Sequence, residues 1–469
     1  MRALMLQTYE RIIGSYWFIP SVMALLAGVL AFGLIEIDQY LPRDVFGTSP
    51  FLFSAQPDGA RAVLGAIGGS MITVAGTVFS VTMATVVFAS GTYGPRLLTN
   101  FMQDRGNQVT LGVFVATFIY TMLVLRSVRD GGPNSGYGPM FVPTVAIYGG
   151  LFLAIVSIGV LIYFIHHVPS NIHISNVISG IGESLLKRMD KEFAKRSEEE
   201  DEDEAQRLWN EVPACFRSDR GGERQGGGYA EIACDRTGYL QIVDRNSLIS
   251  AACEHGLVVR MICRPGMFVH PGRVLFDAWP KDRVDDDTRD ALLASIAAGS
   301  SRSPRQDINF LFDELVEIAG RALSPGVNDP YTAITCMDWL KAACCKLASM
   351  KMPSRLIGDE EGNLRLIAMR AGFAEFLEVA FGHIRQYAAS DMIAGEHYLN
   401  CLAQIAPACR DDEQREAVRF QKTRFLGLAR LALDGSALKT VEAAGKRVTD
   451  CLSDPTGREE TLEVASPAG

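Results

Sequence analysis

The sequence predicts an α-helical polytopic membrane protein with four transmembrane helices and a cytoplasmic α+β domain, itself a small β-barrel-like module plus an α bundle. Three observations support this class. Four apolar runs within residues 1–170 are each long enough to cross a bilayer, which takes about 20 residues. Most of the charge follows these runs, and all ten cysteines lie at or after Cys215. Scattered cysteines on apolar faces are typical of buried thiols in a reducing compartment.

The four predicted spans are Trp17–Ile35, Ala62–Ser90, Val109–Leu125 and Phe141–Ile165. Four spans place both termini on one side of the membrane. The Lys/Arg-rich segment 187–196 marks that side as cytoplasmic by the positive-inside rule. We therefore expect a multi-pass protein of a bacterial inner membrane with both termini cytoplasmic. The first run is too long for the h-region of a signal peptide.

The second span carries hydroxyl side chains at helical spacing on one face: Ser70, Thr73, Thr77 and Ser80. Small and hydroxyl residues allow close helix packing, so one interpretation is a helix–helix interface. The other interpretation is the lining of a polar pathway in an oligomer. No Asp, Glu, Lys or Arg lies inside any predicted span, which argues against a proton relay or a voltage sensor.

Two polar clusters lie at the predicted cytoplasmic ends of the spans. Arg96, Asp104 and Arg105 either provide topological anchoring and loop capping, or form a charged ring at a pore mouth. Three histidines lie in the segment 166–173, where Pro169 is expected to interrupt the helix. Because no cysteine lies nearby to complete a ligand set, we expect interfacial anchoring there and no metal site.

The run from Gly69 to Val128 and the segment Arg321–Ile334, RALSPGVNDPYTAI, together resemble a bacterial family of predicted membrane proteins, domain of unknown function 2254. The resemblance covers nearly the whole chain. It implies the same membrane architecture, and it implies no catalytic residues because the family has no assigned biochemistry.

The chain divides at composition changes into five segments. Residues 1–170 form the transmembrane domain, 171–228 a helix with an acidic and Gly-rich linker, and 229–283 the β module. Residues 284–455 form the α-helical domain and 456–469 a disordered tail. The spacing in the β module is similar to the hairpins of biotinyl and lipoyl carrier domains, but no lysine stands at a hairpin tip to carry a prosthetic group.

Residue periodicity and capping signals place the elements of the α-helical domain. The expected helices are Asp285–Ala298, Arg305–Leu323, Ala368–Ala389, Met392–Ala408, Asp412–Leu433 and Ala437–Ser453, with a hairpin at Ser354–Ile367. Asp329 before Pro330 is a strong helix start. Asn328, Asp329 and Thr332 therefore belong either to a tight helix connector or to a ligand or ion site at a helix N-terminus.

The sequence contains none of the nucleotide-binding, metalloprotease, hydrolase or kinase motifs. We therefore expect no enzyme, no catalytic residue and no cofactor. The net charge of −9 argues against a nucleic-acid partner. Two functions fit the sequence: a homo-oligomeric channel or passive pathway lined by the second span, with ions as possible partners besides the lipid bilayer, or a membrane-anchored regulatory or scaffold protein whose cytoplasmic domain binds a partner.

Overall fold

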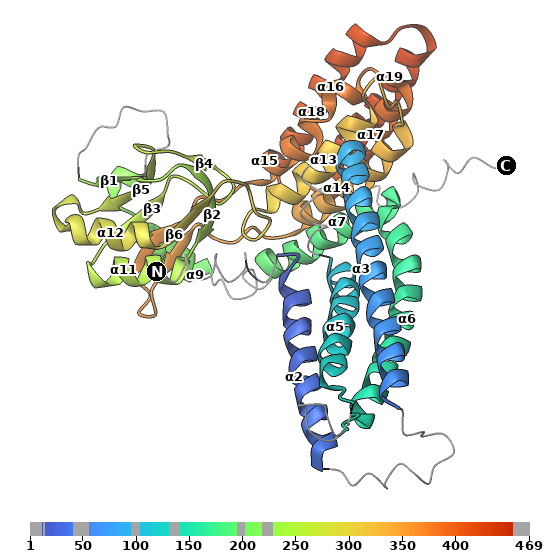
Figure 1. Ribbon diagram of the computed structural model, residues 1–469. Helices are drawn as coiled ribbons and strands as arrows, with labels where there is room; N and C mark the ends of the chain where they lie inside the picture. Colours follow the sequence, from blue (N-terminus) through green and yellow to red (C-terminus); the bar gives the residue numbers. More distant parts are fainter. Residues whose placement is uncertain are drawn as a thin grey trace. The chain divides into compact units, whose positions relative to one another are not determined.

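The computed structural model describes residues 12, 15–40, 56–94, 104–130, 140–194, 202–217 and 228–453. These residues belong to two compact units, one of residues 9–176 and one that begins at Val177. We call them the four-helix unit and the C-terminal unit (Figure 1). Arg96 and the expected tail 456–469 lie outside the described residues.

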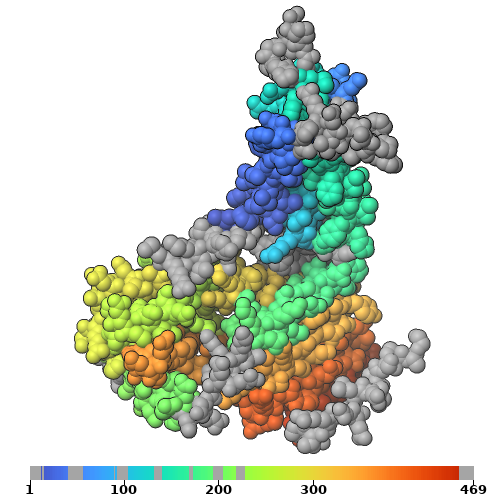
Figure 2. All heavy atoms as spheres, turned by 90° about the horizontal axis from the view of Figure 1, so that it is seen from below, coloured from blue at the N-terminus to red at the C-terminus, as the bar shows by residue number. Residues whose placement is uncertain are grey.

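Four helices make up the first unit: α2 (Phe18–Tyr40), α3 (Pro57–Tyr93), α5 (Arg105–Ser127) and α6 (Thr144–Ile172). All four are long and apolar enough to cross a membrane, as the sequence predicts. Helix α5 is the central helix of the unit. Half of its apolar stretch is buried, whereas at most 28% is buried in each of the other three helices. Figure 2 shows the unit as an elongated body in blue to green.

Helix α6 continues to Ile172, so the expected interruption at Pro169 is wrong. A proline in a helix interior removes one backbone hydrogen bond, and a helix with 25 residues before it can tolerate that loss. Helix α3 has 37 residues and is therefore about 55 Å long, well beyond the hydrocarbon thickness of about 30 Å.

Small and hydroxyl residues of α5 and α6 form the packing seam inside the four-helix unit. The Thr117 and Ser157 hydroxyls lie 3.0 Å apart, and the Tyr120 hydroxyl donates to the carbonyl of Ala146 at 2.7 Å. A Cβ at Gly149 would collide with the Tyr120 hydroxyl. Buried hydroxyl pairs hold membrane helices together where no hydrophobic driving force does so.

The C-terminal unit contains two sheets. Their strands are β1 (Ala230–Ala233), β2 (Gly238–Val243), β3 (Val258–Met261), β4 (Phe268–Val269), β5 (Val274–Trp279), β6 (Ile296–Gly299), β7 (Leu356–Gly358) and β8 (Leu364–Ile367). The orders are β1-β5-β3-β8-β7 and β4-β2-β6, and neither sheet closes. The expected barrel-like module is therefore wrong. The hairpin at 356–367 exists, but it extends the larger sheet through a parallel β3–β8 pair.

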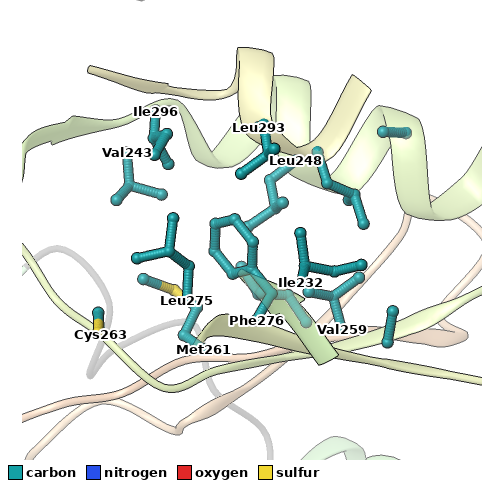
Figure 3. Packing of buried hydrophobic residues seen from close by; sticks show 14 of the residues in the cluster. Ile232, Val243, Leu248, Val259, Met261, Cys263, Leu275, Phe276, Leu293 and Ile296 are labelled. Carbon is teal, nitrogen blue, oxygen red and sulfur yellow. The ribbon is translucent and has the colours of Figure 1, made fainter. Parts of the chain in front are cut away.

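Helices α11 (Arg245–Glu254) and α12 (Asp286–Ala294) cover the larger sheet. Leu248 and Leu293 point from them toward Phe276 and Val259 of the sheet (Figure 3). Helix α12 begins after the Asp285 cap as predicted, but the predicted helix end at residue 298 is wrong. Residues 296–299 form β6 instead, because they pair with β2.

Two short helices, α9 (Glu202–Glu211) and α10 (Ala214–Arg217), occupy part of the expected linker. Leu208 and Val212 are buried against Val258 and Leu364, so the helix face gains enough apolar burial to order the end of an acidic run. The expected linker thus includes helical residues.

The remaining helices of the C-terminal unit are α7 (Ile174–Met189), α13 (Ile308–Ala322), α14 (Pro330–Ser349), α15 (Phe373–Leu377), α16 (Arg385–Ala388), α17 (Met392–Ile405), α18 (Asp412–Ala432) and α19 (Gly435–Ser453). The expected single helix at 368–389 is broken: a π-helical turn, Glu378–Gly382, separates α15 from α16. All ten cysteines are described, none forms a disulfide, and six are buried. Burial of thiols is thus confirmed for these six.

Candidate functional site on the second membrane helix

The hydroxyl stripe (Ser70, Thr73, Thr77 and Ser80) lies on the outer face of the four-helix unit. All four residues are exposed. The opposite face of α3 packs inward through residues spaced three or four apart: Leu64, Gly68, Met71, Ala75, Val78, Thr82 and Val86. Because about 100° separates successive residues, the two faces lie on opposite sides of the helix. The stripe is therefore no packing face among the described residues of the four-helix unit.

Each hydroxyl of the stripe donates to a carbonyl of its own helix. Thr73 donates to Gly69 at 2.9 Å, Thr77 to Thr73 at 3.1 Å, and Ser80 to Gly76 at 2.8 Å. Ser70 donates to Ile67 at 2.9 Å. A hydroxyl that has given its proton to the backbone still has lone pairs to offer. The stripe therefore presents a row of oxygen acceptors outward without leaving a donor unsatisfied.

Small residues extend the stripe at both ends. Ala62, Ala66 and Ala84 continue the same spacing and are exposed. From 62 to 84, about 33 Å of helix, this face carries no side chain larger than threonine. Bulky apolar residues suited to lipid are exposed elsewhere on α3 and on the two helices α2 and α6: Ile72, Phe79 and Phe88 on α3, Leu25, Leu26, Val29 and Phe32 on α2, and Phe152, Ile155, Ile158 and Ile162 on α6.

Glycines show the same contrast between the inner and outer faces. A Cβ at Gly68 would lie 3.1 Å from the Thr121 hydroxyl, and one at Gly112 would lie 2.5 Å from the Met23 sulfur. A Cβ at Gly69 or Gly76 would meet nothing within 4 Å among the described residues. The inner glycines permit helix contacts inside the unit, whereas the outer glycines leave the backbone of α3 open to a further partner.

Asp104 and Arg105 lie at the start of α5. Asp104 caps this helix by accepting from the backbone N–H of Gly106 at 2.6 Å and of Asn107 at 3.3 Å. Its other oxygen lies 3.1 Å from Nε2 of His167 on α6. Arg105 is exposed. The capping interpretation therefore accounts for Asp104, while the charged-ring interpretation stays a prediction.

Sequence reasoning missed the Asp104–His167 pair. His167 also stacks on Tyr163, with ring centroids 4.9 Å apart, and its Nδ1 lies 3.2 Å from the Tyr163 hydroxyl. A signal was available, because consecutive helices usually lie side by side, which brings the start of one close to the end of the next. Two amides of the first turn of α5, Asn107 and Gln108, are buried at the same end.

The other end of the unit is held by a second set of polar contacts. Asp38 at the end of α2 accepts from the N–H groups of Val145 and Ala146, both at 2.9 Å, and so caps α6. Arg61 of α3 lies 3.3 Å from the Val128 carbonyl and 2.6 Å from Asp130. These contacts fix the direction of α3 and with it the direction of the stripe.

The third candidate cluster lies at the start of α14. The Asp329 carboxylate accepts hydrogen bonds from the backbone N–H of Thr332 at 3.1 Å and from the Thr332 hydroxyl at 2.6 Å. Asn328 is exposed and has a φ of 51°, the left-handed region that asparagine tolerates. The Thr332 hydroxyl and backbone bonds hold the pKa of Asp329 below its usual value. These bonds make the cluster a helix cap, and a ligand there stays a prediction.

Replacing Asp329 with alanine should destabilise the C-terminal unit by about 1 kcal/mol, the usual cost of a lost helix cap. Because the folded pKa is lowered, this contribution is present above the ordinary aspartate pKa of about 3.9 and disappears as pH falls through the folded value. Urea unfolding at pH 7 and at pH 3 measures the difference. An Asp329→Ala deficit equal at both pH values would contradict the cap.

Comparisons with known proteins give one family and several relatives. A family model described as "Predicted membrane protein (DUF2254)" matches residues 13–404. The chain is 32% identical over 412 residues to the uncharacterized protein Rv1290c of Mycobacterium tuberculosis and to the uncharacterized protein Mb1321c of Mycobacterium bovis. The aligned part covers 86% of this chain and 75% of each relative. No solved structure matches.

Proposed function

This chain belongs to the DUF2254 family of predicted membrane proteins, and from that premise we propose that it is a homo-oligomer of the bacterial inner membrane whose α3 helices line an ion-conducting or passive-transport pathway. The observation that carries the proposal is the exposed hydroxyl stripe on α3. An exposed membrane helix faces lipid, another helix or water. The stripe suits the last two better than lipid, because its residues are small and offer oxygen acceptors.

A pathway along this stripe needs more than one copy of the chain. The interior of the described four-helix unit is filled by the α5 and α6 seam, including Phe114, Tyr120 and Phe164. Several α3 helices around a symmetry axis would bring their stripes together and enclose a polar lumen about as long as the bilayer is thick. Hydroxyl oxygens can then replace part of the hydration shell of a passing ion.

The orientation is part of the proposal. Because the chain crosses four times, the first and last residues of the four-helix unit lie on the same side of the membrane. Ser15, Gly94, Asp104 and His173 lie at that side. The basic residues that follow, such as Lys187 and Arg188 in the last turn of α7, favour the cytoplasm for that side. Both termini and the C-terminal unit would then be cytoplasmic.

The test is the mass of the purified full-length protein in detergent, followed by ion flux after reconstitution in liposomes. We expect an oligomer and a flux of monovalent ions above that of protein-free liposomes. A strict monomer without flux would refute the pathway. It would favour the other function, a membrane-anchored regulatory or scaffold protein whose C-terminal unit binds a partner.

A further inference from the structure

Three metal-ligating side chains meet between two helices of the C-terminal unit, far in sequence from α3. Asp338 comes from α14, and His397 and Cys401 come from α17, which packs against α14. One ligand atom from each residue lies within 4.8 Å of the other two. His397 and Cys401 are four residues apart and therefore share one face of their helix.

The donor types and their spacing fit a zinc-class ion. A carboxylate oxygen, an imidazole nitrogen and a thiolate sulfur are the three ligand kinds of zinc sites. With metal–ligand bonds of about 2.0–2.3 Å, tetrahedral ligands stand about 3.3–3.8 Å apart. Nε2 of His397 already lies 3.0 Å from Oδ1 of Asp338. The Cys401 sulfur lies within 4.8 Å of both atoms, so side-chain adjustment is needed to place all three around one ion.

The three side chains differ in their exposure to solvent. Cys401 is fully buried, whereas the Asp338 side chain is 44% exposed and that of His397 24% exposed. A soft sulfur ligand thus lies inside, and an ion can enter past the carboxylate. We infer that Asp338, His397 and Cys401 bind a Zn²⁺-class ion, with a fourth position left to solvent.

Lys341 is expected to lower the affinity of this site for a metal ion. Its ammonium lies one turn from Asp338 and donates to Oδ1 of that residue at 2.9 Å. This ammonium competes with a metal ion for the Asp338 carboxylate, and its positive charge opposes the binding of a second cation. Its side chain is 21% exposed, so its long stem can carry the charge into solvent. Removing the competing ammonium should therefore tighten metal binding.

The test is a Co²⁺ titration of the full-length protein in detergent after metal removal with a chelator. We expect one Co²⁺ per chain with a thiolate-to-cobalt charge-transfer band, reversed by Zn²⁺. Cys401→Ser should abolish this band. His397→Gln should weaken Co²⁺ binding at least about tenfold, while Cys253→Ser, an exposed cysteine outside the cluster, should leave it unchanged.

Lys341→Met distinguishes a metal site from a purely structural polar bridge between the helices. A metal site predicts a lower Co²⁺ dissociation constant for this variant than for the wild type, by about tenfold. The inference is overturned if the wild type shows no charge-transfer band, if Cys401→Ser keeps it, or if Lys341→Met binds no more tightly. Circular dichroism of each metal-free variant separates lost binding from lost folding, and His397→Gln tests the site independently at a partly exposed position.

Discussion

Replacing both Thr77 and Ser80 with leucine is expected to lower ion flux at least about tenfold while the oligomer persists. Each leucine removes a hydroxyl oxygen and adds volume to a stripe whose largest side chain is threonine. An apolar constriction drives out water, and a tenfold loss of flux corresponds to a barrier increase of about 1.4 kcal/mol. Liposome flux measures the effect, and the particle mass in detergent measures assembly.

Two further variants of α3 separate the loss of the hydroxyl from the added side-chain volume, and an effect of the stripe from an effect of any exposed position. Thr77→Val keeps the shape but removes the hydroxyl, so flux should fall by less than in the leucine variant. Val81→Leu changes an exposed residue outside the stripe, and flux should not change. If the leucine variant becomes monomeric, the stripe is a contact between subunits and not a lumen. If it keeps both its mass and its flux, the proposed pathway is wrong.

Arg302→Ala is expected to cost the C-terminal unit about 3–5 kcal/mol of unfolding free energy. The guanidinium bonds two carboxylates, Asp307 at 2.8 Å and Asp313, and thereby ties the segment after β6 to α13. The Asp307 side chain is only 6% exposed. Removing the arginine leaves the buried Asp307 beside a second acid, Asp313, without the cation that bonds both of them. Denaturant unfolding of the full chain in detergent, followed by tryptophan fluorescence, measures the loss.

The unfolding free energy lost in Arg302→Ala should depend on pH. Burial already raises the pKa of Asp307 against the pull of Arg302, and without Arg302 it should rise further. A raised folded pKa means that the folded chain binds more protons, so the variant regains stability as pH falls. Arg430→Ala is the control, because Arg430 and Glu442 form an exposed pair worth at most about 1 kcal/mol. An Arg302→Ala loss as small as the control's would contradict this network.

The membrane helices could be predicted from the sequence because each signal is local. An apolar run of sufficient length identifies a span without knowledge of its neighbours. The spacing of Ser70, Thr73, Thr77 and Ser80 likewise predicts a shared face. Its outward direction could not be predicted, because spacing defines a face but not what covers it. That direction depends on the inward residues of α3 packing against α5 and α6.

The errors lie where structure depends on contacts between distant residues. Residues 296–299 have a helical sequence pattern, but pairing with β2 makes them a strand. The barrel-like expectation failed because the larger sheet recruits β8 from beyond α14. The Asp338–His397–Cys401 cluster joins residues about sixty positions apart, so no spacing rule applies to it.

The position of β8 inside the larger sheet has a consequence for synthesis. Strand β3 lies between β5 and β8, and β8 is translated about a hundred residues after β3, which takes about 5–20 s. During that interval one edge of β3, next to the buried Val259, has no strand to pair with. Nascent chains are therefore most prone to aggregation or to chaperone capture between the emergence of Met261 and that of Ile367 from the ribosome.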